Sequence, residues 1–116
     1  MQLKSLMKWA AIGWTIAIFI GCLMPLPAMA PTDVTLHDKA IHGLIFGLWV
    51  VLWITVQRQP VRFLLLGVLF GFGIECLQGI MPLNRHFDWM DLFADSVGAV
   101  IGALIGAVWT QRVARG

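Results

Sequence analysis

Four long apolar runs dominate this chain of 116 residues. They fall at about residues 9–27, 40–57, 61–81 and 90–110. A helix needs about 17 to 25 mainly apolar residues to cross the hydrocarbon core of a bilayer, and each run is long enough. Hydrophobic residues make up 59% of the chain and charged residues only 12%, whereas soluble domains average about 25% charged residues. We therefore predict an all-α fold, a four-helix transmembrane bundle that forms a single domain over residues 1–116.

Basic residues predict the orientation of these spans. Six of the eight Lys and Arg residues flank the spans on one side, and only Lys39 and Arg85 fall on the other. The six are Lys4, Lys8, Arg58, Arg62, Arg112 and Arg115. Because the cytoplasmic loops of membrane proteins carry an excess of basic residues, we predict that both termini are cytoplasmic. The net charge of +2 gives no indication of a nucleic-acid partner.

The first thirty residues also resemble a secretory signal sequence. Lys4 and Lys8 precede an apolar stretch that ends in PAMA, residues 27–30, which is similar to a cleavage site with small residues. Pro31 would directly follow the cut, where proline is unfavourable. The stretch is also long enough to span the membrane, so we expect that the first helix is retained.

Acidic residues and histidines gather on the side opposite the six basic residues. In the predicted topology, all six carboxylates and all three histidines fall in the outer loops or the outer halves of the spans. Spacings of three and four residues place Lys39 near His42, and Asp91 near Asp95, on one face of their helices. Glu75 continues a four-residue repeat of glycines, and such stripes let helices in lipid approach closely. We therefore predict that His42, Glu75 and Asp95 face the bundle interior and can reach one another.

These residues define a predicted polar pocket that opens to the outside of the membrane. Ionised side chains within a span cost about 2.5–3.5 kcal/mol on insertion scales, so they are rare and usually mark a site or a paired structural cluster. Glu75 in particular needs a partner or a proton. The predicted pocket comprises Asp38, Lys39, His42, Glu75, Gln78, Arg85, Asp91 and Asp95.

Three motifs resemble the VanZ-like family, which is named for a protein associated with resistance to the glycopeptide teicoplanin. They are DKAIHGLIFGLWVVLW (38–53), IECLQ (74–78) and NRHFDWMDLFADSVGAVIGALIG (84–106). The match rests on their order and spacing from about residue 38 to 106. Asp95 departs from the family pattern, in which asparagine is usual at that position. The resemblance implies a multi-pass protein of the bacterial plasma membrane that influences teicoplanin susceptibility or envelope lipid and cell-wall homeostasis.

Three interpretations of the cluster remain open from sequence alone. His42 and Glu75 can be a hydrogen-bonded tie that fixes helix register. The pocket can instead bind an envelope lipid or a glycopeptide, with membrane lipid as the surrounding partner. In the third interpretation the protein is an intramembrane hydrolase or transferase that acts on a lipid-linked substrate, with His42 or Glu75 as general base and with Lys39 and Arg85 holding a phosphate or carboxylate.

Cofactor motifs are not found in the sequence. It contains no Gly-x-Ser-x-Gly, Cys-x-x-Cys or His-Glu-x-x-His pattern and no glycine-rich phosphate loop before a helix. His42, Glu75, His86 and Asp95 offer nitrogen and oxygen donors, but they come from different segments without local ligand spacing. The sequence therefore predicts no cofactor and no metal site, and Asp88 is expected to cap the fourth helix. Nothing in the sequence sets an oligomeric state.

Overall fold

The computed structural model describes residues 3–24, 36–82 and 87–115, with the side chains of 36–38 and 114–115 outside the description. All regular secondary structure in the described residues is α-helical. It consists of four helices, α1 (Leu3–Leu23), α2 (Leu36–Gln57), α3 (Pro60–Ile80) and α4 (Trp89–Arg115). All four are long and apolar enough to cross a membrane. The predicted all-α membrane bundle is therefore confirmed, and the protein is a multi-pass membrane protein.

The bounds of α3 agree with the predicted span 61–81 to within one residue, whereas α2 begins four residues before the predicted 40–57 and α4 ends five residues after the predicted 90–110. The whole of α1 is shifted. This helix covers Leu3–Leu23 rather than residues 9–27, so it begins and ends earlier than predicted. Lys4 and Lys8 belong to its first turns, because lysine is a good helix former whose long side chain can carry the charge to the membrane interface. Pro25 follows Met24, and the residue before a proline is disfavoured in the helical conformation.

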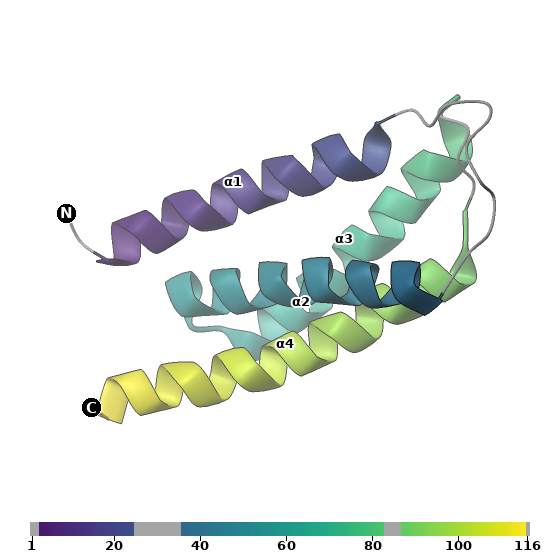
Figure 1. Ribbon diagram of the computed structural model, residues 1–116. Helices are drawn as coiled ribbons and strands as arrows, with labels where there is room; N and C mark the ends of the chain where they lie inside the picture. The colour runs from purple at the N-terminus through teal and green to yellow at the C-terminus, as the bar shows by residue number, and fades with distance from the viewer. Residues whose placement is uncertain (1–2, 25–35, 83–86, 116) are drawn as a thin grey trace.

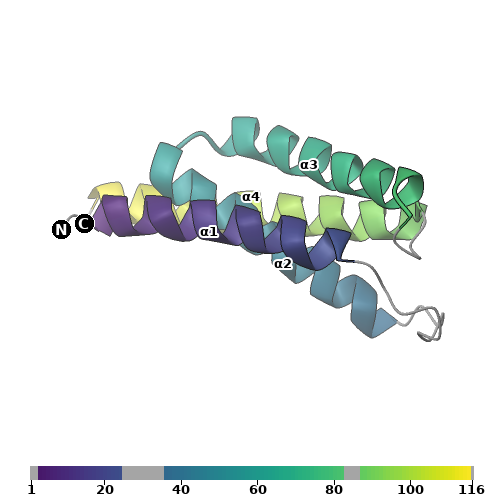
Figure 2. The same ribbon diagram turned by 90° about the horizontal axis from the view of Figure 1, so that it is seen from above.

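The helices form a bundle in which α2 is central. In Figure 1, α2 lies between α1 and α4, and Figure 2 shows α3 running along one side of the other helices. The closest association is between α2 and α4, which are not consecutive in the chain, while α3 lies against α4 and α2. The start of α1 and the end of α4 lie at one end of the bundle (Figure 1). The basic residues at that end are therefore far from Lys39, at the start of α2.

Glycines allow α2 and α4 to touch backbone to backbone. Gly43 and Gly47 on α2 face Gly98 and Gly102 on α4, and we call these four residues the glycine seam. A Cβ atom on Gly98 would overlap the carbonyl oxygen of Gly43, and one on Gly47 would lie 2.9 Å from the carbonyl oxygen of Gly98. Such close approach is how helices associate in lipid, where there is no hydrophobic force between them.

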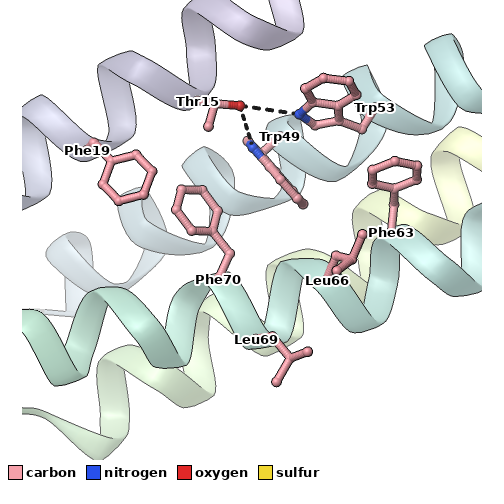
Figure 3. A pocket seen from close by; sticks show the side chains of 8 residues that line it. All are labelled: Thr15, Phe19, Trp49, Trp53, Phe63, Leu66, Leu69 and Phe70. Carbon is pink, nitrogen blue, oxygen red and sulfur yellow. Dashed lines mark hydrogen bonds between the residues drawn. The ribbon is translucent and has the colours of Figure 1, made fainter.

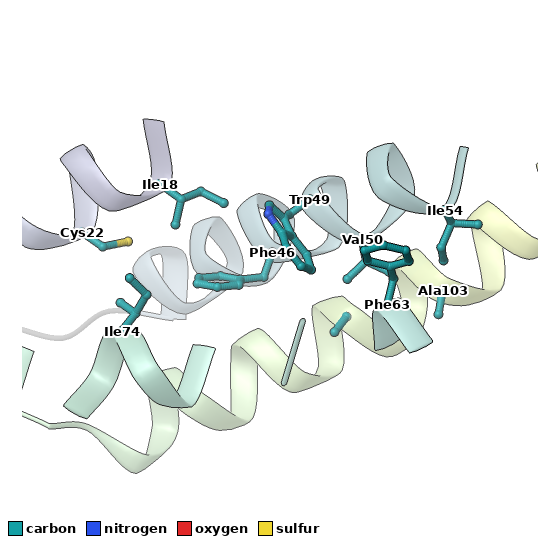
Figure 4. Close-up of a cluster of buried hydrophobic side chains, with 10 residues drawn as sticks. Ile18, Cys22, Phe46, Trp49, Val50, Ile54, Phe63, Ile74 and Ala103 are labelled. Atoms are coloured by element: carbon teal, nitrogen blue, oxygen red, sulfur yellow. The ribbon is translucent and has the colours of Figure 1, made fainter. Parts of the chain in front are cut away.

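Apolar side chains fill the space between the four helices, with α4 contributing the small residues Ala99 and Ala103 (Figure 4). Phe46, Val50 and Ile54 of α2 are completely buried, and Ile74 of α3 nearly so. Ring contacts continue the core, with Trp53 stacked on Phe63 at a centroid distance of 5.7 Å. These contacts give van der Waals energy, which is the main packing term among membrane helices.

Indole groups tie α1 to α2. Trp14 Nε1 donates to the Ile45 carbonyl oxygen at 3.0 Å, and Trp49 Nε1 donates to Thr15 Oγ1 at 2.8 Å. Trp53 Nε1 donates to the same hydroxyl at 3.3 Å, and that hydroxyl donates to the Ala11 carbonyl oxygen at 2.8 Å. Every polar group in this cluster has a partner, as buried polar groups usually do.

The connections position the ends of α3 and α4. Arg58, between α2 and α3, has a positive φ of 58°, and its N–H donates to the Ile54 carbonyl oxygen at 2.7 Å. This is the left-handed residue that often ends a helix, and Pro60 then begins α3 with its fixed φ. Asp88 caps α4, as predicted, because its Oδ1 accepts the Met90 N–H at 2.9 Å.

Candidate functional site: a buried carboxylate and histidine cluster

Polar side chains from three helices meet at one end of the bundle. The start of α2, the end of α3 and the start of α4 lie together there, opposite the start of α1 and the end of α4 (Figure 1). Lys39 and His42 come from α2, Glu75 from α3, and Asp91 and Asp95 from α4. The shared end follows from the up-and-down order of the spans, since α2 and α4 enter the bundle where α3 leaves it.

The outer layer of the site is an ion-pair network around Lys39. Its Nζ donates to Asp88 Oδ2 at 2.7 Å and also to Asp91 Oδ1. The hydrogen bond from Lys39 holds the pKa of Asp88 below its ordinary value of 3.8. The three side chains are between 13% and 24% exposed, so this layer is accessible from the end of the bundle.

Asp88 connects the outer layer to α3 and α4. Its Oδ1 caps α4 and its Oδ2 accepts from Lys39, while its backbone N–H donates to Glu75 Oε2 at 3.0 Å. From the sequence, Asp88 was expected only to cap α4. Its link to Glu75 could not be read from spacing, because the two residues meet through a backbone N–H.

The inner layer contains His42, Glu75 and Asp95, which we call the inner cluster. His42 Nδ1 lies 3.2 Å from Asp95 Oδ1, while the side chains of Glu75 and Asp95 are both completely buried. One potential ligand atom from each of the three residues lies within 4.8 Å of the others. The predicted convergence of these residues on the bundle interior is therefore what the structure shows.

Gly71 makes room for the inner cluster. An ideal Cβ on Gly71 would lie 3.1 Å from Asp95 Oδ2, so the carboxylate of α4 packs directly against the backbone of α3. Gly71 is one turn before Glu75, and both are buried. The glycine repeat on α3 thus places two carboxylates side by side between α3 and α4.

Two oxygen atoms of the inner cluster have no hydrogen-bond partner among the residues that the structure describes. They are Glu75 Oε1 and Asp95 Oδ2, one on each buried carboxylate. Leaving a buried acceptor unsatisfied costs about 1–3 kcal/mol, and more when the group is charged. Among the ion pairs of the described residues, none joins a Lys or Arg to Glu75 or Asp95. The cluster is therefore incomplete as a hydrogen-bonding network.

Gln78 bonds α1, although its spacing from Glu75 suggested a place in the polar pocket. Its Nε2 donates to the Cys22 carbonyl oxygen at 2.7 Å, which ties α3 to the last turn of α1. The last carbonyl groups of a helix have no partner within that helix, so this bond satisfies one of them. Gln78 is buried, and this bond runs to α1 rather than to the inner cluster.

Two predicted pocket residues cannot be placed. Arg85 lies outside the described residues, and Asp38 lies on α2 with its side chain outside the description. The other predicted residues form the two layers, apart from Gln78. Lys39 is engaged by two carboxylates, so it is not free to hold an anionic group in the way that the enzyme interpretation required.

A separate groove of about 440 Å³ is lined by none of the residues of the inner cluster or of the Lys39 network. Figure 3 shows that aromatic rings of α1, α2 and α3 line it, and the polar atoms drawn there are the Thr15 hydroxyl and the two indole nitrogens. Its lining is Thr15, Phe19, Trp49, Trp53, Phe63, Leu66, Leu69 and Phe70. Because its polar groups bond one another, the groove presents an apolar surface to whatever occupies it.

The inner cluster can accept protons, cations or hydrogen-bond donors, because it consists of carboxylates and an imidazole. A buried imidazole beside a carboxylate can accept or deliver a proton, and its partner carboxylate orients the ring. Two free carboxylate oxygens can take a proton, a cation or the donor groups of a ligand. The same three side chains offer the nitrogen and oxygen donors that divalent metal ions bind.

Comparison with known proteins gives one match. A family model described as VanZ/LLP1 matches residues 3–110, a range that includes α1 as well as the three helices that carry the motifs. No curated protein and no solved structure matches. The resemblance inferred from residues 38–106 is thus confirmed and extended toward the N-terminus.

Proposed function

Because this chain belongs to the VanZ/LLP1 family, we propose that it alters the susceptibility of a bacterial cell to glycopeptide antibiotics such as teicoplanin. In this proposal the polar end of the bundle lies at the outer face of the plasma membrane. There the inner cluster recognises the polar headgroup of an envelope lipid, and both termini are in the cytoplasm.

The orientation rests on charge. Lys4 and Lys8 begin α1, Arg58 and Arg62 flank the α2–α3 connection, and Arg112 is in the last turns of α4. These residues lie at the end of the bundle opposite Lys39. By the positive-inside rule that end is cytoplasmic, which places the inner cluster in the outer leaflet.

One observation carries the functional role of the cluster, namely the two buried oxygens without a partner. A tie that serves only to hold helices together is stable when all of its groups are satisfied, as in the Thr15 cluster. The inner cluster instead retains two acceptors at a cost in stability. Such a cost is typical of binding and catalytic sites, where groups are held ready for a ligand.

Susceptibility of a deletion strain tests this proposal. The strain is complemented with wild type, Glu75→Gln or His42→Gln, and teicoplanin and vancomycin susceptibility are measured with membrane levels checked by blot. Ser96→Ala is the matched control, because Ser96 adjoins Asp95 and its hydroxyl bonds only the Leu92 carbonyl oxygen of its own helix.

We expect wild type and Ser96→Ala to shift teicoplanin susceptibility and the two cluster variants to fail at normal membrane levels. If the cluster variants complement fully, the cluster is a structural tie. If wild type changes nothing, the family phenotype does not apply to this protein.

A second candidate is an intramembrane enzyme that acts on a lipid-linked envelope substrate. The contact between His42 Nδ1 and Asp95 Oδ1 favours it, because a carboxylate that orients an imidazole is a common arrangement for a general base. Incubating the purified protein with an envelope lipid extract of the deletion strain tests this candidate by mass spectrometry. New headgroup products that require His42 would support catalysis, and an unchanged lipid profile would leave binding as the function.

A further inference from the structure

The inner cluster has the composition of a metal site. We propose that His42, Glu75 and Asp95 together bind one divalent metal ion of the Zn²⁺ or Mn²⁺ type. This inference goes beyond the proposed function, because ion binding can be tested whether or not the protein changes drug susceptibility. The sequence predicted no metal site, since each ligand stands on a different helix.

The distances within the cluster suit a single ion. Neighbouring ligands of a metal ion held by bonds of about 2.0–2.2 Å lie about 3–3.5 Å apart, and opposite ligands about 4.4 Å apart. His42 Nδ1 and Asp95 Oδ1 are 3.2 Å apart, which matches a neighbouring pair. One donor atom from each residue lies within 4.8 Å of the others, so side-chain movements of about 1 Å bring the set to the spacing of neighbouring ligands.

The unsatisfied oxygens indicate a cation rather than a proton. Glu75 Oε1 and Asp95 Oδ2 are both buried, and neither has a partner within residues 3–24, 36–82 and 87–115. Protonation of one carboxylate would neutralise that group and leave the other buried carboxylate charged. A cation between the two carboxylates is coordinated by both of them at once and also by the imidazole nitrogen.

Charge balance points the same way. Two carboxylates and a neutral imidazole carry a charge of −2, which a divalent ion neutralises. Lys39 does not supply this charge, because its ammonium is bound by Asp88 and Asp91. Burying uncompensated charges within a membrane span is costly, and a bound ion removes that cost.

The donor set restricts the kind of ion. One imidazole and two carboxylates without a thiolate suit Zn²⁺ or Mn²⁺, whereas Mg²⁺ and Ca²⁺ prefer oxygen ligands alone. Three protein ligands also leave a coordination position open, as in catalytic rather than structural zinc sites. The open position would accept water or a polar group of a membrane-embedded ligand.

The surrounding groups support the ligands in a manner typical of metal sites. The Asp88 backbone N–H holds Glu75 Oε2 at 3.0 Å, which orients the carboxylate and leaves Oε1 available. Asp88 and Asp91, which are partly exposed, lie between the inner cluster and the end of the bundle. These outer carboxylates offer an approaching cation an access path.

Metal binding by the purified protein tests the proposal. The protein in detergent is stripped with a chelator and titrated with Zn²⁺ or Mn²⁺, and bound metal is measured by mass spectrometry after dialysis. Bound Mn²⁺ is then examined by pulsed electron paramagnetic resonance for coupling to an imidazole nitrogen. Thermal unfolding with and without the ion verifies that each variant is folded.

We expect one ion per wild-type chain and a nitrogen coupling that disappears in His42→Gln. Glu75→Gln and Asp95→Asn should each lower the affinity at least about 100-fold, because even the loss of a supporting residue costs about 10–100-fold. Ser96→Ala should bind as wild type does. The ion should raise the unfolding temperature of wild type and of Ser96→Ala, and not that of Asp95→Asn.

Three results would overturn the proposal. They are substoichiometric metal uptake by folded wild type, wild-type affinity in both carboxylate variants, and Mn²⁺ binding without nitrogen coupling. Each can occur with or without a change in teicoplanin susceptibility, so failure of the ion proposal is distinguishable from failure of the proposed function.

Discussion

The glycine seam and the inner cluster use the same pair of helices in opposite ways. Both lie largely between α2 and α4, and both follow from spacings of three and four residues. At the seam, the backbones of Gly43 and Gly98 touch and no side chain intervenes. At the inner cluster, His42 and Asp95 hold the helices together through side chains and leave oxygens without partners. The glycine seam therefore contributes packing between the helices, whereas the inner cluster provides groups that can bind a ligand.

Substitution in the glycine seam should have the largest effect. Gly98→Ala places a Cβ where the Gly43 carbonyl oxygen lies, so α2 and α4 must separate. We expect a loss of about 3 kcal/mol or more in unfolding free energy, the upper range for overpacking, measured by denaturant titration in detergent. Gly73→Ala is the control, because its Cβ would meet nothing within 4 Å. Equal stability of the two variants would contradict backbone contact at the seam.

Gln78 tests what a satisfied polar group contributes at the polar end. Gln78→Leu removes the bond to the Cys22 carbonyl oxygen and leaves that oxygen without this donor. We expect a destabilisation of about 1–3 kcal/mol by the same titration. Thr55→Val is a suitable reference, because the Thr55 hydroxyl bonds only its own helix at Val51. Equal losses in both variants would argue against a tie between α1 and α3.

Asp95→Asn should change stability in the other direction. The substitution removes a buried charge whose Oδ2 has no partner and keeps an amide that can still pair with His42. We expect the metal-free variant to gain about 1 kcal/mol in unfolding free energy while it loses metal binding. A destabilised variant would place Asp95 with Gln78 among the structural ties.

The outer layer should give the smallest effect, and it depends on pH. Because the pKa of Asp88 is lower in the folded state, its ion pair with Lys39 contributes stability above pH 3.8 and loses it as the pH falls through the folded-state pKa. The contribution is about 1 kcal/mol or less for a partly exposed pair. Wild type and Asp88→Asn should therefore differ at pH 7 and converge below pH 3.8 in thermal unfolding. A constant difference across this range would exclude the ion pair as its source.

The sequence predicted the membrane bundle well because span length and small-residue spacing are local properties. It also predicted that His42, Glu75 and Asp95 meet, since their spacings with Asp38, Gly71 and Asp91 fix a face on each helix. The bond from Gln78 to α1 was not predicted, because Glu75 and Gln78 share nearly one face of α3 and the sequence does not tell which neighbour each side chain meets.

The role of Asp88 and the α2 side of the seam escaped prediction for a physical reason. A backbone N–H that reaches Glu75 has no signature in residue types. Gly43 and Gly47 were overlooked because two glycines four residues apart do not reveal which partner helix they face. Only the structure pairs them with Gly98 and Gly102.

The order in which the bundle can assemble follows from the pairing of α2 with α4. The carboxylates that bind Lys39 lie 49 and 52 residues further along the chain, and the glycines that complete the seam are later still. During synthesis, α2 and α3 therefore enter the membrane before the principal partner of α2 exists. Until α4 arrives, an exposed lysine and an open backbone face distinguish an unfinished chain from a finished one. A ribosome that stops before α4 leaves a product that membrane quality control can recognise.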